Sequence, residues 1–115
     1  MVGFEKKYQG DIVIIIVDFS RATISEAGKF KRLIDDELSK KTLKMIIDLS
    51  NCEYLDSTFI GVLVVALKKI SEIGGELRLV EPLSISLSTL AATGILDIFN
   101  LYKTQTEAIS NFIEL

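Results

Sequence analysis

A run of six consecutive β-branched residues, Ile12 to Val17, most strongly limits the folds open to this chain. A strand with one solvated face alternates apolar and polar residues, whereas a continuous β-branched run is typical of a strand covered on both faces. A second apolar strand is predicted over Leu43 to Leu49, and the segment between the two has helical periodicity. Because a helix of that length joins two buried strands, we expect a parallel, right-handed crossover in an α/β sheet.

The residues before this run predict a hairpin. Phe4, Lys6 and Tyr8 share one face of an alternating segment with Val2, and Gln9-Gly10-Asp11 is typical of a tight turn. The charged residues mixed into this segment favour an edge strand. The sheet is therefore expected to be mixed, with an antiparallel hairpin added to parallel strands.

Two long helices are predicted from capping and periodicity. The capping-box pattern Thr23-Ile24-Ser25-Glu26 opens the first helix. The second helix is expected from Ser57 to Ser71 or Glu72, with a glycine stop at Gly74-Gly75. The apolar positions of the first helix, at spacings of three and four, are Ile24, Ala27, Phe30, Ile34 and Leu38.

The remaining chain predicts a strand at Glu76 to Val80, a helix at Ser84 to Thr93, a short strand near Ile98 to Tyr102, and a terminal helix from Thr104 to about Ile113. The full order is β-β-α-β-α-β-α-β-α. We expect a single domain over residues 1–115, an α/β fold built on one mixed β-sheet layer with an N-terminal hairpin and about four helices.

Composition excludes several function classes. A net charge of −3 and a pI near 4.9 give no electrostatic footprint for nucleic acid or an anionic membrane. The chain has no histidine, which removes the Ser-His-Asp triad and the commonest zinc ligand. Cys52, the only cysteine, is expected to be a small, semi-buried loop residue. We expect a cytoplasmic, non-enzymatic protein with no cofactor and no metal.

The candidate functional residue is Ser57. Parallel strands point their carboxyl ends toward one rim, where α/β sheets usually place their chemistry. Ser57 follows Asp56 at that rim, where a helix N-terminus leaves backbone N–H groups without partners and favours a negative group. The local pattern also fits a purely structural role, with either Asp56 or Ser57 as the helix cap.

The strand ending Ile47-Asp48-Leu49-Ser50 is followed by a loop ending Tyr54-Leu55-Asp56-Ser57-Thr58. This combination resembles the anti-sigma factor antagonist (STAS) family, whose strand reads as an apolar run into Asp-Leu-Ser and whose loop carries an Asp-Ser-(Ser, Thr or Ala)-Gly-(Leu, Ile)-Gly signature. The order of elements, including the opening hairpin, also matches over nearly the whole chain. The sequence departs at Phe59, which occupies the position of the first signature glycine, and at Ile16, which replaces a glycine before Asp18.

The resemblance implies a regulatory role. In the family, the serine that maps onto Ser57 is phosphorylated by a partner that is both anti-sigma factor and serine kinase, and only the unmodified form binds that partner. Thr58 is a second-choice acceptor, and a phosphatase would reset the switch. The large ring of Phe59 would either contact a partner or obstruct a kinase, and Val62 is a weaker candidate for the same surface. The expected partner-binding residues are Asp18, Asp56, Ser57, Thr58, Phe59 and Gly61.

Two alternatives remain open. In a receiver-like domain, Asp18, Asp48 and Lys103 would converge on the rim, bind Mg²⁺ and accept a phosphoryl group on Asp48. In a scaffold or a small-ligand or nucleotide-binding module, the same fold would act without phosphorylation. The chain has no glycine-rich phosphate loop, which counts against ordinary nucleotide binding.

Overall fold

The computed structural model describes residues 3–83 and 94–112, and its centre is one five-stranded sheet. The strand order is β1-β2-β4-β6-β7, with β1 antiparallel to β2 and every other neighbouring pair parallel. The mixed sheet and the opening hairpin are therefore confirmed. The strands are β1 (Gly3–Gln9), β2 (Ile12–Asp18), β4 (Lys44–Asp48), β6 (Glu76–Val80) and β7 (Asn100–Tyr102).

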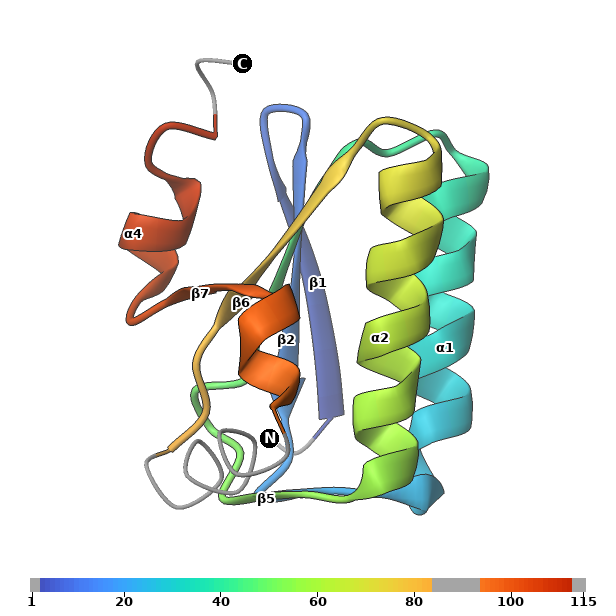
Figure 1. Ribbon diagram of the computed structural model, residues 1–115, viewed down its shortest axis with the longest axis vertical. Coiled ribbons are helices and arrows are strands. Elements are labelled where there is room, and N and C mark those ends of the chain that lie inside the picture. Colours follow the sequence, from blue (N-terminus) through green and yellow to red (C-terminus); the bar gives the residue numbers. More distant parts are fainter. Residues whose placement is uncertain (1–2, 84–93, 113–115) are drawn as a thin grey trace.

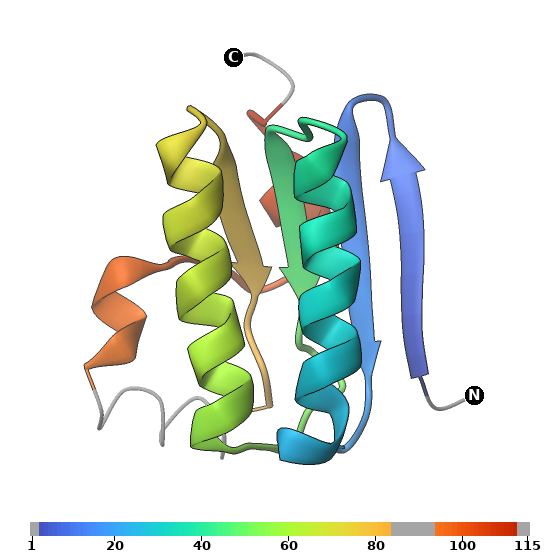
Figure 2. The ribbon, with the colours of Figure 1, turned by 90° about the vertical axis from the view of Figure 1, so that its right-hand side faces the viewer.

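Helices cover both faces of the sheet. The long helices α1 (Ile24–Ser39) and α2 (Ser57–Glu72) lie on one face, and the short helix α4 (Gln105–Ile109) lies on the other (Figure 1). Figure 2 shows α1 and α2 side by side in front of the sheet, with their N-terminal ends at the same rim. No helix within residues 3–83 and 94–112 has the length and apolar character needed to cross a bilayer.

Two elements differ from expectation near the C-terminus. The last strand begins at Asn100 instead of Ile98, because Ile95–Ile98 forms a 3₁₀ turn. The helix α4 ends at Ile109 instead of Ile113, and the backbone reverses at Asn111, where φ is 67°. The helix predicted for Ser84 to Thr93 lies outside the described residues.

The alternation along β2 explains how one apolar strand serves two cores. Val13, Ile15 and Val17 face the α1 and α2 layer, whereas Ile12 and Ile14 pack toward α4. All five side chains are fully buried. The prediction of a strand covered on both faces is confirmed, and β2 lies beside β4 at the centre of the sheet.

A second, two-stranded sheet forms at the rim where the parallel strands end. Its strands β3 (Arg21–Ala22) and β5 (Tyr54–Leu55) are parallel, and neither was expected from the sequence. The carbonyl of Ser20 accepts the N–H groups of Glu53 and Tyr54, and the carbonyl of Ala22 accepts the N–H of Asp56. This small sheet ties the loop after β2 to the loop that leads into α2.

A buried carboxylate joins α1 to the edge strand at the opposite rim. Glu37 is fully buried, and Lys6 (2.8 Å), Thr42 (3.0 Å) and Tyr8 all donate hydrogen bonds to it. Burial alone would raise the pKa of Glu37, but these hydrogen bonds outweigh it and lower the pKa to about 2. The ionised form is therefore the stable one.

Candidate functional site

Asp56 is the N-cap of α2. Its extended backbone precedes the helix, and its Oδ1 accepts the N–H of Phe59, the third helical residue, at 2.8 Å. This is the usual geometry of an aspartate cap. Of the two residues that the sequence allowed as caps, the structure uses Asp56, and α2 begins at Ser57 as expected.

The same carboxylate also serves α1. The other oxygen of Asp56, Oδ2, accepts the N–H of Ile24 at 2.8 Å. Ile24 is the first residue of α1, whose own cap, Thr23, accepts the N–H of Ser25 and forms a capping box with Glu26. A single carboxylate therefore bridges the N-termini of two neighbouring helices, and both positive helix ends meet beside Ser57.

Ser57 and Thr58 are exposed at this junction. Among the described residues, neither hydroxyl takes part in a hydrogen bond, because Asp56 provides the cap. The first N–H groups of a helix have no intrahelical acceptor, and only that of Phe59 is taken by Asp56. Ser57 thus combines an accessible hydroxyl with a site that favours added negative charge.

The ring of Phe59 does not lie at the surface, contrary to the expectation that it contacts a partner or obstructs a kinase. The ring is fully buried and stacks on Phe30 of α1, with centroids 4.5 Å apart and planes 4° from parallel. Phe30 in turn stacks on Phe4 of the edge strand, at 5.5 Å. Phe59 lies on the side of α2 that faces the core, as do Ile60 and Leu63. Its ring therefore stabilises the helix pair and leaves the surface near Ser57 open.

Asp18 and Asp48 lie close enough to Cys52 for their charges to act on its thiol. Asp18 is half-buried and accepts a hydrogen bond from the Asn51 side chain at 3.2 Å. Cys52 is fully buried, and its thiol lies 3.7 Å from the carbonyl oxygen of Val17. Burial, reinforced by the charges of Asp48 and Asp18, raises the pKa of Cys52 to about 12. The thiol is therefore an inert packing group and not a nucleophile.

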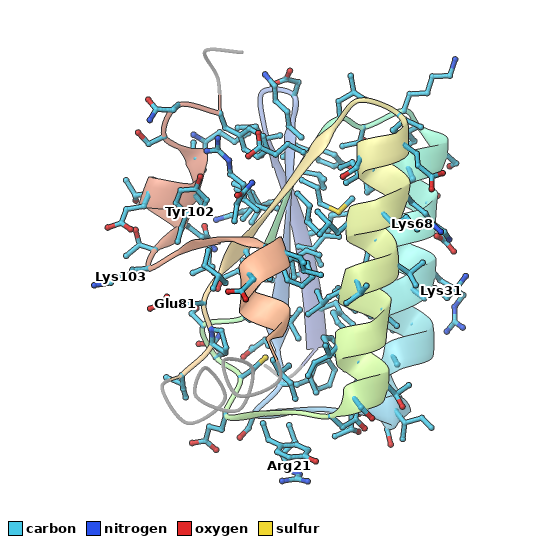
Figure 3. The ribbon with its side chains drawn as sticks, in the orientation of Figure 1. Arg21, Lys31, Lys68, Glu81, Tyr102 and Lys103 are labelled. Atoms are coloured by element: carbon cyan, nitrogen blue, oxygen red, sulfur yellow. The ribbon has the colours of Figure 1, made fainter. Side chains whose placement is uncertain are left out.

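The carboxylate of Asp48 is buried and already has partners. It accepts hydrogen bonds from the Ser50 N–H at 2.9 Å and from the Gln105 side chain at 2.7 Å. Lys103, by contrast, is exposed and extends away from the sheet (Figure 3). No group of three or more metal-ligating side chains forms in the part of the chain that the structure describes. The arrangement lacks the converging acids and lysine of a receiver-like site.

Three exposed residues near Ser57 were not predicted from the sequence to belong to the site. Ile24 is 68% exposed and Tyr54 is 43% exposed, while the Arg21 guanidinium lies 4.3 Å from the Tyr54 ring centroid. Figure 3 shows Arg21 beyond the small rim sheet, at the end where α2 begins. Ile24 looked like part of the helix's apolar stripe, and only the contact with Asp56 places it at the site.

Gly61, four residues after Ser57, lies on a different face of α2 from Phe59. It lines an apolar groove between α1 and α2. Val62 lines the same groove and is half-buried, which agrees with its partial packing against the core.

Comparison with known proteins matches this chain to one family over most of its length. The model of the STAS domain family matches residues 4–108. A candidate anti-sigma factor antagonist of Thermotoga neapolitana is 35% identical over 107 residues, covering 92% of this chain and 94% of the relative. The crystal structure of a candidate anti-sigma factor antagonist from Thermotoga maritima is 35% identical, with a TM-score of 0.84, and covers 92% of this chain and 91% of that one.

A more distant structure shares the fold. The phosphorylated form of the Bacillus cell fate determinant SpoIIAA has a TM-score of 0.73 at 16% identity, over 93% of this chain and 96% of that chain. At this identity the likeness extends to the arrangement of strands and helices and not to individual site residues.

Proposed function

The chain belongs to the STAS domain family, and from this premise we propose that it is an anti-sigma factor antagonist switched by phosphorylation of Ser57. The unmodified form binds an anti-sigma factor that is also a serine kinase. Phosphorylation releases that partner, and a phosphatase restores binding. The protein acts by association, as one cytoplasmic STAS domain over residues 1–115, and catalyses no reaction itself.

The observation that carries this proposal is the uncommitted hydroxyl of Ser57. Its neighbour Asp56 caps α2 and holds the N-terminus of α1, so Ser57 is not needed for either structural task. The hydroxyl is exposed at the end of the helix. A kinase can approach it without unfolding the loop.

The modification would act through charge. A phosphate adds about −1.5 to −2 charge and three acceptor oxygens. An exposed helix N-terminus stabilises such a group by ~0.3–1 kcal/mol, so the fold tolerates it. A partner surface that covers Ser57 must instead bury the phosphate next to the carboxylate of Asp56. Because burying an unpaired charge is far more costly than that stabilisation, the complex dissociates.

The position of Phe59 supports phosphorylation over a permanently unmodified scaffold. A bulky side chain at the usual glycine position would obstruct a kinase only if it projected toward the hydroxyl. The ring instead packs on Phe30 in the core. The surface around Ser57 includes the exposed side chains of Thr58 and Ile24.

The test begins with affinity capture of the partner by the wild-type chain from its own cell extract. The captured complex is incubated with ATP, and the phosphate is located by mass spectrometry. We expect modification of Ser57 and release of the partner, with neither event in Ser57→Ala. Ser71→Ala, at an exposed serine in the last turn of α2, is the matched control and retains both.

A Ser57→Asp variant supplies a second measurement. It is expected to bind the captured partner at least tenfold more weakly than the wild type. Phosphate at another residue, a captured kinase that leaves Ser57 unmodified, or unchanged binding by Ser57→Asp contradicts the proposal.

A further inference from the structure

An apolar groove runs along the outer side of the helix pair, beginning directly beside the rim site. Its volume is about 290 Å³, and its walls come from both helices. Thr58, Gly61, Val62 and Val65 of α2 line it, and Ile34 of α1 lies opposite. Val65 is 45% exposed, so the groove presents apolar surface to solvent.

Among the residues that the structure describes, none makes a contact that requires a glycine at position 61 in this groove. Its φ is not positive, and an added Cβ would meet no atom within 4 Å apart from its own helix. By contrast, a Cβ on Gly75 would lie 2.6 Å from the carbonyl oxygen of Leu43, so that glycine is needed by the fold. Glycine inside a helix is less stable than alanine. The fold of the described residues therefore leaves open space beside Gly61, where a group of another molecule can approach the backbone closely.

The charged side chains at the edge of the groove favour a bound group with negative charge. Asp35 accepts hydrogen bonds from Lys31 at 2.7 Å and from Lys69 at 2.9 Å, and all three line the groove. Two ammonium groups share one carboxylate, so this edge is positive although the whole chain carries −3. Lys68 and Lys31 both project from the side of the helix pair that faces away from the sheet (Figure 3).

We propose that this groove receives an acidic amphipathic helix of the partner protein. Residues 58 to 69 of α2 span roughly 17 Å at the helical rise, which matches about three turns of a docked helix. Its apolar face would lie against Val62, Val65 and Gly61, and its acidic side chains would face Lys31 and Lys69. The inference rests on the proposed function only in that the partner is the same protein that Ser57 controls.

A synthetic helix tests the chemistry without the partner. The probe is a stapled peptide of about 14 residues with leucines at i, i+3, i+4 and i+7 and glutamates on its flanks. A second peptide keeps the leucines and replaces every glutamate by lysine. Each is titrated into isotope-labelled full chain while amide chemical shifts are followed. The acidic peptide is expected to bind at least tenfold more tightly, with shifts at Thr58, Gly61 and Val65.

Variants test the groove itself. Gly61→Ala and Gly61→Leu place atoms in the open space, and each is expected to weaken both the acidic peptide and the captured partner at least tenfold. Gly28→Ala is the matched control, because Gly28 is a second helical glycine whose added Cβ meets only Arg32, at 3.6 Å. The pair Lys31→Glu and Lys69→Glu should reverse the peptide preference, whereas Lys29→Glu, on the exposed side of α1 and outside the groove, should not.

Each outcome separates the two proposals. The groove proposal is contradicted if both peptides bind equally or if the chemical shifts change elsewhere. It is also contradicted if the partner binds Gly61→Leu as tightly as the wild type but does not bind Ser57→Asp. Each of these results leaves the phosphoswitch proposal intact. If decanoate binds tightly at the groove residues and the acidic peptide does not bind, the helix proposal is contradicted and the occupant of the groove is a small amphiphile. Selective acidic-peptide binding at the groove with no modification of Ser57 supports the groove and contradicts the switch.

Discussion

The carboxylate of Asp56 accepts the backbone N–H of Ile24, 32 residues earlier in the chain, at 2.8 Å, while it also caps its own helix. This single contact holds the starts of α1 and α2 together at the rim. It also brings an exposed apolar side chain to the phosphorylation candidate. The site is therefore a junction of two helices and not a feature of α2 alone.

Removing this bridge should weaken both helix starts. In Asp56→Ala, the N–H groups of Ile24 and Phe59 lose their acceptor, and we expect the free energy of unfolding to fall by ~1–3 kcal/mol. Urea unfolding measures the loss, and amide hydrogen exchange should quicken at both residues. Asp56→Asn retains one acceptor oxygen, so only one of the two amides should lose protection. Exchange that changes at Phe59 alone in Asp56→Ala would show that the link to α1 does not form in solution.

Phe59 should behave as a core residue. Phe59→Ala removes a fully buried ring from a stack with Phe30, and such a truncation costs about 3–5 kcal/mol. Thermal or urea unfolding measures the change. Tyr54→Ala, at an exposed aromatic residue of the same rim, is the control and should cost under about 1 kcal/mol. Similar losses for the two variants would place the Phe59 ring at the surface.

Two glycines should respond to alanine in opposite directions. Gly61→Ala is expected to raise the free energy of unfolding by ~0.5–1 kcal/mol, because alanine is the better helix former and the added methyl meets no neighbour. Gly75→Ala is expected to lower it, since the new Cβ would lie 2.6 Å from the Leu43 carbonyl oxygen. Equilibrium unfolding of both variants provides the measurement, and a destabilised Gly61→Ala would mean that the fold itself needs that glycine.

Acid should destabilise the fold partly through Glu37. Its pKa is about 2 in the folded state and near the ordinary value of 4.5 when unfolded. A lowered folded pKa means that the stabilisation is present above pH 4.5 and is lost as the pH falls from there toward 2. We expect the loss to be on the order of 1–2 kcal/mol after allowance for solvent screening.

The comparison for that prediction is Glu37→Gln, which keeps the shape of the side chain and cannot ionise. The variant should be less stable at neutral pH, and its unfolding free energy should depend less on pH between 4.5 and 2. Parallel pH dependence in the two proteins would assign the acid sensitivity to other carboxylates.

The sequence by itself determined the elements whose signals are local. The β-branched run of β2, the capping box at Thr23 and the glycine stop after α2 each depend on residues within a few positions, and each appears where expected. The start of α2 at Ser57 was predictable for the same reason. Backbone propensity and periodicity are properties of a short segment.

Tertiary structure alone decided how the site is assembled. The pairing of β3 with β5, the second bond of Asp56 and the burial of Phe59 against Phe30 all join segments about 30 residues apart. A helix that is apolar on most sides carries no local mark of which side meets a neighbour. The packing of α1 beside α2 determines that side, because it buries Phe59 in the core and places Gly61 in the groove.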